Sequence, residues 1–112
     1  MPQPRDERLA RNEASFRALN EAIETKVHAK LSGPQSSLAG FVCECGDPEC
    51  ADIVRISLAG YEKVRQDSCL FLIRPGHEIL QVEDVVQREE GYFVVRKHDN
   101  VADILRETDP RT

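Results

Sequence analysis

The stretch Cys43-Glu44-Cys45-Gly46-Asp47-Pro48-Glu49-Cys50 places three thiols in one short segment that also carries glycine and proline. On an extended strand Cys43 and Cys45 point to the same face, because successive side chains alternate. Gly46 lets the chain turn, and the bend at Asp47-Pro48 can bring Cys50 back to the other two thiols. Zinc needs ligands that converge from such a turn, at about 2.0–2.3 Å in a tetrahedron. We therefore predict one structural zinc site in this loop.

Three thiolates leave a tetrahedral site one ligand short. His77, within the run Arg74-Pro75-Gly76-His77-Glu78, follows a short apolar segment and lies on a predicted turn. That turn could deliver the imidazole to the end of the sheet where the cysteines lie. Cys69 is the alternative, although it precedes the apolar segment and buried free cysteines commonly serve as small apolar residues. We favour His77 as the fourth ligand, and we expect His28 and His98 to face solvent.

Cysteine usage also bears on the cellular compartment. No apolar run approaches the roughly 18 residues of a membrane span, and the polar start of the chain does not look like a signal peptide. We therefore expect a cytoplasmic protein, in which closely spaced cysteines indicate metal or redox chemistry more than disulfides.

The other explanation of the three neighbouring cysteines is a chance cluster or a cluster of reactive thiols. Metal is favoured because so small a fold often needs a staple, and structural zinc supplies on the order of 10 kcal/mol.

Residues 1–31 are predicted to form one long amphipathic helix, helical from about residue 5. Its apolar stripe holds Leu9, Phe16, Leu19, Ile23, Val27 and Leu31, with Asn12 and Asn20 inside it. The opposite face holds Ala10, Ala14, Ala18, Ala22 and Ala29 among charges. The stripe could pack on the rest of the protein, with the asparagines at its wet edges. Alternatively, part of the helix protrudes and pairs with a partner or a second copy, and the asparagines fix the register. We expect one end of the helix to be free.

The rest of the chain is predicted to comprise a linker at 32–40 and a zinc-binding α+β domain at 41–112. The Gly-Pro pair after the helix favours its termination there. The expected elements are a strand at 54–58, a helix over about 58–67 capped by Ser57, a buried strand at 70–73, a hairpin of 82–87 with 92–97, and a last helix over about 101–108 capped by Asp99 or Asn100. The predicted fold class is α+β: a long N-terminal helix followed by a small antiparallel sheet with two short helices and a zinc knuckle.

Several short motifs resemble those of a group of small uncharacterised bacterial proteins, most of them actinobacterial. The motifs are Arg11-Asn12-Glu13, Phe16-Arg17, Asn20-Glu21, Cys43-Glu44-Cys45 with Cys50, Tyr61-Glu62 and Pro75-Gly76-His77-Glu78. The resemblance covers nearly the whole chain. It implies a site formed by Cys43, Cys45, Cys50 and His77, because the position of Cys69 is usually not a cysteine in that group. It implies no activity.

The distribution of charge disfavours nucleic acid as a partner. Residues 41–112 hold nine basic and fifteen acidic side chains, against six and five in residues 1–40. Nucleic-acid binders usually carry a basic footprint for phosphate, and here the cysteine-bearing part has the opposite sign. Binding would require a shared basic face made of Arg55, Arg65, Arg74, Arg88, Arg96 and Lys97.

The sequence favours a non-catalytic function. A site with three thiolates makes zinc a poor Lewis acid, and neither a Gly-rich phosphate loop nor a His-Glu-x-x-His motif is present. Glu44, Glu49 and Glu78 lie near the ligands in sequence, but we expect them to be solvated charges. The leading hypothesis is a zinc-binding module, possibly regulatory in role, that binds another protein through the N-terminal helix or self-associates. The alternatives are a zinc-thiolate redox or metal sensor, with Cys69 as a resolving thiol, and a nucleic-acid-binding zinc module.

Overall fold

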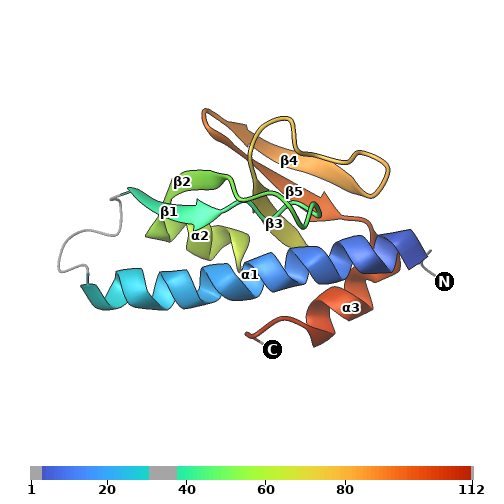
Figure 1. Ribbon diagram of the computed structural model, residues 1–112, viewed down its shortest axis with the longest axis horizontal. Helices are drawn as coiled ribbons and strands as arrows, with labels where there is room; N and C mark the ends of the chain where they lie inside the picture. The colour runs from blue at the N-terminus through green and yellow to red at the C-terminus, as the bar shows by residue number, and fades with distance from the viewer. Residues whose placement is uncertain (1–3, 31–37, 112) are drawn as a thin grey trace.

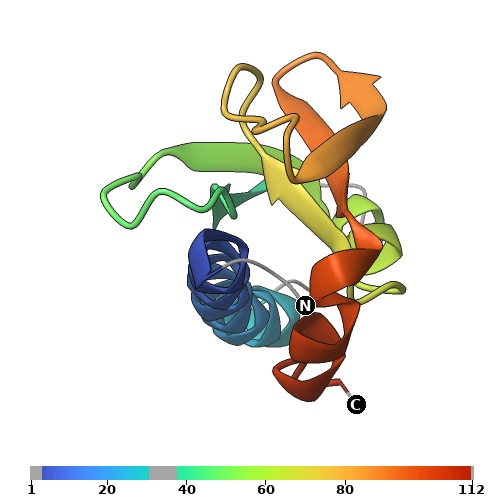
Figure 2. The same ribbon diagram turned by 90° about the vertical axis from the view of Figure 1, so that its right-hand side faces the viewer.

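Helix α1 (Pro4–Lys30) runs along the length of the protein, and both sheets lie on one side of it (Figure 1). The fold is that of a computed structural model, which describes residues 4–30 and 38–111, with side chains described for 4–26 and 38–111. Seen along α1, the short C-terminal helix lies beside α1 and the sheets cover the two helices (Figure 2). Within the described part of the chain, no helix is both long and apolar enough to cross a membrane.

Within residues 4–30 and 38–111, five strands form two antiparallel sheets, whereas the sequence predicted one. Strands β1 (Leu38–Val42) and β2 (Ile53–Ser57) pair with each other, and β3 (Leu70–Ile73), β5 (Tyr92–Lys97) and β4 (Glu83–Glu89) form a second sheet in that order. Three short helical elements complete the fold, namely α2 (Leu58–Val64), the 3-10 turn η1 (Asp99–Val101) and α3 (Ala102–Glu107). The α+β class and the long N-terminal helix are confirmed.

Local chemistry explains most of the element boundaries. Ser57 ends β2 and caps α2, because its hydroxyl accepts a hydrogen bond from the backbone N–H of Gly60 at 3.0 Å. Gly91 has a φ of +91°, which glycine adopts without strain, at the turn between β4 and β5. Two expected details were wrong. Strand β1 begins at Leu38, inside the predicted linker, and the last helical segment has no side-chain cap from Asp99 or Asn100.

The core lies between α1, α2 and the two sheets. Phe41 of β1 stacks on Tyr61 of α2 with ring centroids 4.3 Å apart. On β2 the alternate residues Val54 and Ile56 are buried, whereas Ile53 is 56% exposed. All of β3 from Phe71 onward is buried, as its uniform apolar character predicts.

The buried face of α1 differs from the predicted apolar stripe. It consists of Ala10, Glu13, Ala14, Arg17 and Asn20, whereas Leu19 is 48% exposed. Leu9, Phe16 and Ile23 are only half-buried. The helix is packed through polar groups that find partners in the chain, and through alanines small enough for close approach to its neighbours. Its contacts extend from Asp6, which accepts a hydrogen bond from Asn100, to Glu24, which accepts one from Arg111. The predicted helix residues after position 26 lie outside the described side chains.

Two buried charges on α1 illustrate this packing. The ammonium of Lys97 lies 2.9 Å from a carboxylate oxygen of Glu13 and 3.3 Å from one of Glu83. One cation faces two buried carboxylates, and burial raises the pKa of Glu13 to about 8. Arg17 donates to the backbone oxygens of Ser68 and Leu105. Most of the surface that anchors the helix is therefore one that periodicity marks as polar, although Asn20 lies within the predicted apolar stripe.

Candidate metal centre

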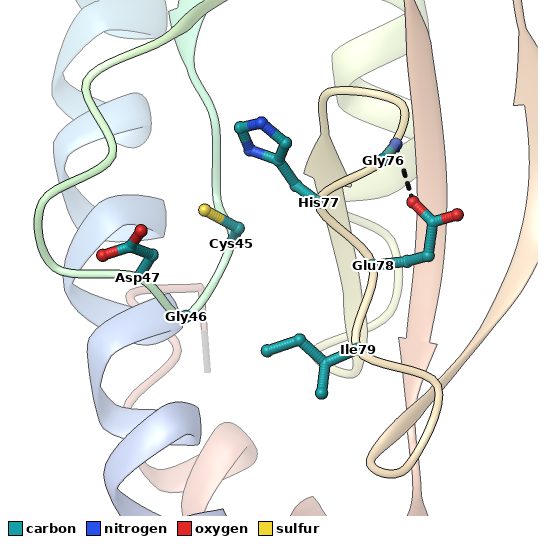
Figure 3. Close-up of a pocket in the computed structure, with 7 residues that line it drawn as sticks. All are labelled: Cys45, Gly46, Asp47, Gly76, His77, Glu78 and Ile79. Atoms are coloured by element: carbon teal, nitrogen blue, oxygen red, sulfur yellow. Dashed lines mark hydrogen bonds between the residues drawn. The ribbon is translucent and has the colours of Figure 1, made fainter.

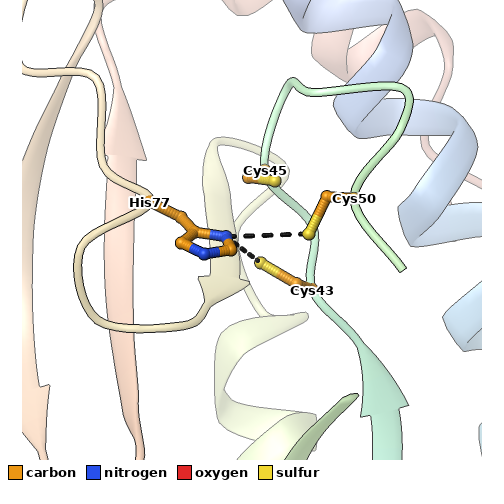
Figure 4. A group of neighbouring side chains, drawn as sticks. All are labelled: Cys43, Cys45, Cys50 and His77. Carbon is orange, nitrogen blue, oxygen red and sulfur yellow. Dashed lines mark hydrogen bonds between the residues drawn. The ribbon is translucent and has the colours of Figure 1, made fainter. Parts of the chain in front are cut away.

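Three cysteines and one histidine converge where the two sheets meet. Cys43 directly follows β1, Cys45 and Cys50 lie in the loop before β2, and His77 lies in the turn after β3. Their ligand atoms all lie within 4.8 Å of one another. The Nδ1 atom of His77 is 3.5 Å from the sulfur of Cys43 and 3.6 Å from that of Cys50 (Figure 4). This group could hold a metal ion.

Hydrogen bonds within the loop bring Cys50 back towards the other thiols. The backbone N–H of Cys43 donates to the oxygen of Asp52 at 2.9 Å, which closes the base of the loop. Asp47 accepts from the N–H of Glu49 with its side chain and from the N–H of Cys50 with its backbone oxygen. This is the bend that the Asp-Pro pair predicts.

Gly46 lies at a bend of the chain, as expected, and it has a second role in packing. Its φ is not positive, so no special turn requires glycine there. A Cβ at this position would instead lie 2.5 Å from the Cδ2 atom of Leu9 on α1. Asn12 of the same helix donates to the backbone oxygen of Gly46 at 3.1 Å. The glycine allows the loop to pack directly on α1.

The imidazole of His77 lies close to a carboxylate, that of Asp52, which was not among the predicted site residues. The Nε2 atom of His77 lies 3.5 Å from a side-chain oxygen of Asp52, on the opposite side of the ring from the thiols. A histidine ligand whose second nitrogen faces a carboxylate is a recurrent arrangement around protein-bound metals, because the carboxylate fixes the tautomer and the ring orientation. The only clue in the sequence is that Asp52 follows Cys50 by two residues.

Glu44, which lies between two of the thiols, is fully buried, so the prediction of a solvated charge was wrong. Its carboxylate accepts hydrogen bonds from the amide of Asn20, the hydroxyl of Tyr61 and the backbone N–H of Leu72, at 2.8, 2.6 and 2.9 Å. Burial raises its pKa, although these hydrogen bonds oppose the shift. Its own N–H donates to the oxygen of Leu72, so Glu44 occupies the edge of β3 with backbone and side chain. These two contacts join the segment that follows β1 to the edge of β3.

The other two glutamates near the ligands differ from Glu44. Glu49 is exposed, as predicted. Glu78 is half-buried and accepts a hydrogen bond from the backbone N–H of Gly76 at 2.8 Å. Gly76 has a φ of +94°, so the turn that carries His77 uses the conformational freedom of glycine.

The thiols influence one another's ionisation. A hydrogen bond from Cys45 and the backbone N–H of Arg74, 3.3 Å from the sulfur of Cys43, lower the pKa of Cys43, while burial opposes them. The same thiol contact, together with burial, raises the pKa of Cys45. Burial is the main cause of the raised pKa of Cys50. A bound cation would relieve the cost of holding several thiolates together.

A cavity of about 330 Å³ lies beside the group. The side chains of Cys45 and His77 face it from opposite walls, and its lining is completed by Gly46, Asp47, Gly76, Glu78 and Ile79 (Figure 3). The group of three cysteines and one histidine is therefore adjacent to solvent-accessible space on the side of Cys45.

Cys69 and His98 do not join the group. Cys69 is buried at the start of β3 and is not among the clustered ligands of the described residues. Its N–H donates to the side chain of Asp67. The imidazole of His98 is 39% exposed and lies near Asp84, 3.4 Å from its carboxylate. The side chain of His28 lies outside the described residues.

Neither a known protein family, nor a characterised protein, nor a solved structure matches this chain. The resemblance to the actinobacterial group therefore adds nothing to the functional interpretation, which depends on geometry and chemistry alone.

Proposed function

We propose that the four clustered residues hold a structural zinc ion. In a regular tetrahedron with a Zn–S bond of 2.3 Å and a Zn–N bond near 2.05 Å, sulfur and nitrogen are separated by about 3.6 Å. The nitrogen of His77 lies 3.5 and 3.6 Å from two of the sulfurs. This match is the observation that carries the proposal. Three thiolates with one imidazole are also the donor set that zinc prefers over harder cations.

The proposed ion has a structural role because of the elements that supply its ligands. Three ligands come from the segment that joins β1 and β2, and the fourth follows β3 in the other sheet. An ion here ties the two sheets together. Four protein ligands complete a tetrahedron and leave no position for a reactive water, which is the usual difference between structural and catalytic zinc.

We further propose that the module acts by binding another protein, without catalysis, in a reducing compartment. Support comes from large apolar side chains that the fold leaves at the surface, namely Leu19, Leu38, Ile53, Leu80 and Val86. Helix α1 is a less suitable docking surface than the sequence suggested, since its packed face already binds the rest of the chain. Among its described side chains, Leu19 is the one large apolar group with high exposure.

Two other functions receive different degrees of support. The cavity beside Cys45 favours a redox sensor as the second candidate, because a small hydroperoxide could reach a zinc-bound thiolate there. Nucleic-acid binding loses support, because Arg65 and Lys97 are buried in ion pairs within the chain. These two side chains cannot contribute to an exposed basic face.

Elemental analysis with thiol counting on the purified protein tests the zinc site. We expect close to one zinc per chain, lost in Cys45→Ser and retained in Cys69→Ser, which alters a buried thiol outside the group. A metal-free protein with full cooperative unfolding would refute the proposal. Titration with hydrogen peroxide separates the second candidate, since a structural site without sensor function should retain its zinc at oxidant concentrations that sensors detect.

A further inference from the structure

The outer face of the β1–β2 sheet carries a groove that the fold does not fill. Leu38 and Ile53 project from it, with exposed fractions of 64% and 56%. Gly40 lies between them with no side chain, and Ile53 leans over it: a Cβ at position 40 would lie 3.0 Å from the Cγ2 atom of Ile53. The groove has a volume of about 470 Å³ and is lined by Leu38, Ile53, Arg55, Arg74, Glu90 and Gly91.

The two aliphatic side chains line the same groove from opposite ends of the sheet. The inner face of the same sheet packs in the core through the buried apolar residues Phe41, Val54 and Ile56. Strand alternation then predicts polar residues on the outer face of a two-stranded sheet. Single exposed apolar residues are common on protein surfaces, but adjacent ones rimmed by charges are typical of interaction sites.

The rim of the groove is positively charged, in contrast to the chain's overall charge of −5. Arg55 is exposed and makes no ion pair with any residue that the structure describes. Arg74 is half-exposed and lies 3.8 Å from Asp52, a weak contact. Glu90 is the one acidic residue of the lining. Two arginines beside an apolar floor are complementary to a ligand that combines carboxylates with aliphatic or aromatic groups.

Strand addition at the Val42 end of β1 is hindered, and the face of the sheet offers the exposed apolar side chains. The side-chain amide of Asn20 donates to the backbone oxygen of Val42 and accepts from its N–H, both at 2.8 Å. Asn20 thus occupies both outward backbone groups at that position. A peptide would have to bind through side chains laid across Leu38 and Ile53.

We propose that this groove binds a short acidic peptide segment of a partner protein. The segment's apolar side chains cover Leu38 and Ile53, and its carboxylates pair with Arg55 and Arg74. This inference rests on the proposed protein-binding function and specifies the surface and the chemistry of the partner. The groove borders the metal centre, because the backbone N–H of Arg74 donates to the sulfur of Cys43.

Selection of short random peptides displayed on phage against the immobilised zinc-loaded full-length chain tests the proposal. We expect the selected peptides to be enriched in Asp and Glu together with Leu, Ile, Val or Phe. Synthetic copies of the best binders are then titrated by fluorescence anisotropy. The double variant Leu38→Ser, Ile53→Ser and the variant Arg55→Glu should each weaken binding by on the order of tenfold or more. Higher salt should weaken binding to the native protein, because the charge pairs lie at an exposed rim.

The matched control replaces two other exposed aliphatic residues, Leu80→Ser with Val86→Ser, whose exposed fractions are 63% and 51%. Binding to this control should stay within about twofold of that to the native protein. Selection of basic peptides, or of acidic peptides whose binding the groove variants do not weaken, would refute the groove as the binding site. The proposed protein-binding function would still stand. Failure to select any peptide would count against both the groove and the proposed protein-binding function. Self-association abolished by the Leu38, Ile53 double variant would also overturn the proposal and assign the face to a second copy of the chain.

Discussion

Replacing Asn20 by alanine should destabilise the protein far more than the same change at Asn12, eight residues away on the same helix. Asn20 is fully buried and makes three hydrogen bonds, two with the backbone of Val42 and one with the carboxylate of Glu44. Asn12 makes a single hydrogen bond, to the oxygen of Gly46. Both changes improve helix propensity equally, by about 0.6 kcal/mol.

The expected sizes follow from the number and type of these bonds. Two neutral hydrogen bonds contribute about 1 kcal/mol each and one to a charged group about 2 kcal/mol, so Asn20→Ala should cost about 3.5 kcal/mol after the gain in propensity. The same estimate for Asn12→Ala is about 0.5 kcal/mol. With a urea dependence near 1.5 kcal/mol per molar, the midpoints should fall by about 2 M and about 0.3 M.

Urea unfolding of the zinc-loaded native protein and both variants, followed by circular dichroism, measures this difference. Zinc content is determined for each sample, so that loss of the ion is not mistaken for loss of the hydrogen bonds. Equal midpoints for the two variants, or a cost below about 1 kcal/mol for Asn20→Ala, would refute the inference that the three hydrogen bonds of Asn20 stabilise the attachment of α1.

Three further outcomes are expected. Asp52→Asn should lower zinc affinity by about 10-fold to 100-fold in competition with a chelating dye, because the carboxylate no longer orients the imidazole ligand; Asp84→Asn, beside an unrelated histidine, should leave it unchanged. Tyr61→Phe should lower the free energy of unfolding by about 2 kcal/mol, since it removes one donor to Glu44 and keeps the aromatic ring. The pKa of Glu13 rises from 4.5 to about 8 on folding, so the folded state binds this proton more tightly and stability should fall as the pH rises through that interval. Glu13→Gln should reduce this fall, measured as the difference in urea midpoint between the two ends of the interval.

Periodicity in the sequence predicted the elements whose environment is simple. The run from Leu70 to Ile73 is a buried strand, and the two segments around Gly91 pair as a hairpin. It failed for α1 because it assumes that the apolar side of a helix faces the core. The buried partners of Arg17 and Asn20 are backbone oxygens and carboxylates from distant parts of the chain, and no local pattern marks them.

The four candidate ligands could be named from the sequence. Three thiols at such short spacing rarely serve a purpose other than metal binding or redox chemistry, and three thiolates leave one position for a histidine. The placement of Glu44 was also within reach. If Cys43 and Cys45 share one face of an extended segment, the residue between them must point to the opposite face, towards the core. The role of Asp52 was not predictable, since it depends on how the turn after β3 presents the ring of His77.

The alternation of Cys43, Glu44 and Cys45 places the candidate metal site next to the hydrogen bonds that attach α1. Two of these side chains belong to the group that could hold a metal ion, while the third accepts a hydrogen bond from Asn20 of α1. If ion binding stabilises the attachment of the helix, then by thermodynamic reciprocity the attached helix raises the ion affinity by the same factor. A molecule that bound α1 and detached it from the sheets could then lower the ion affinity of the site without contacting any sulfur atom.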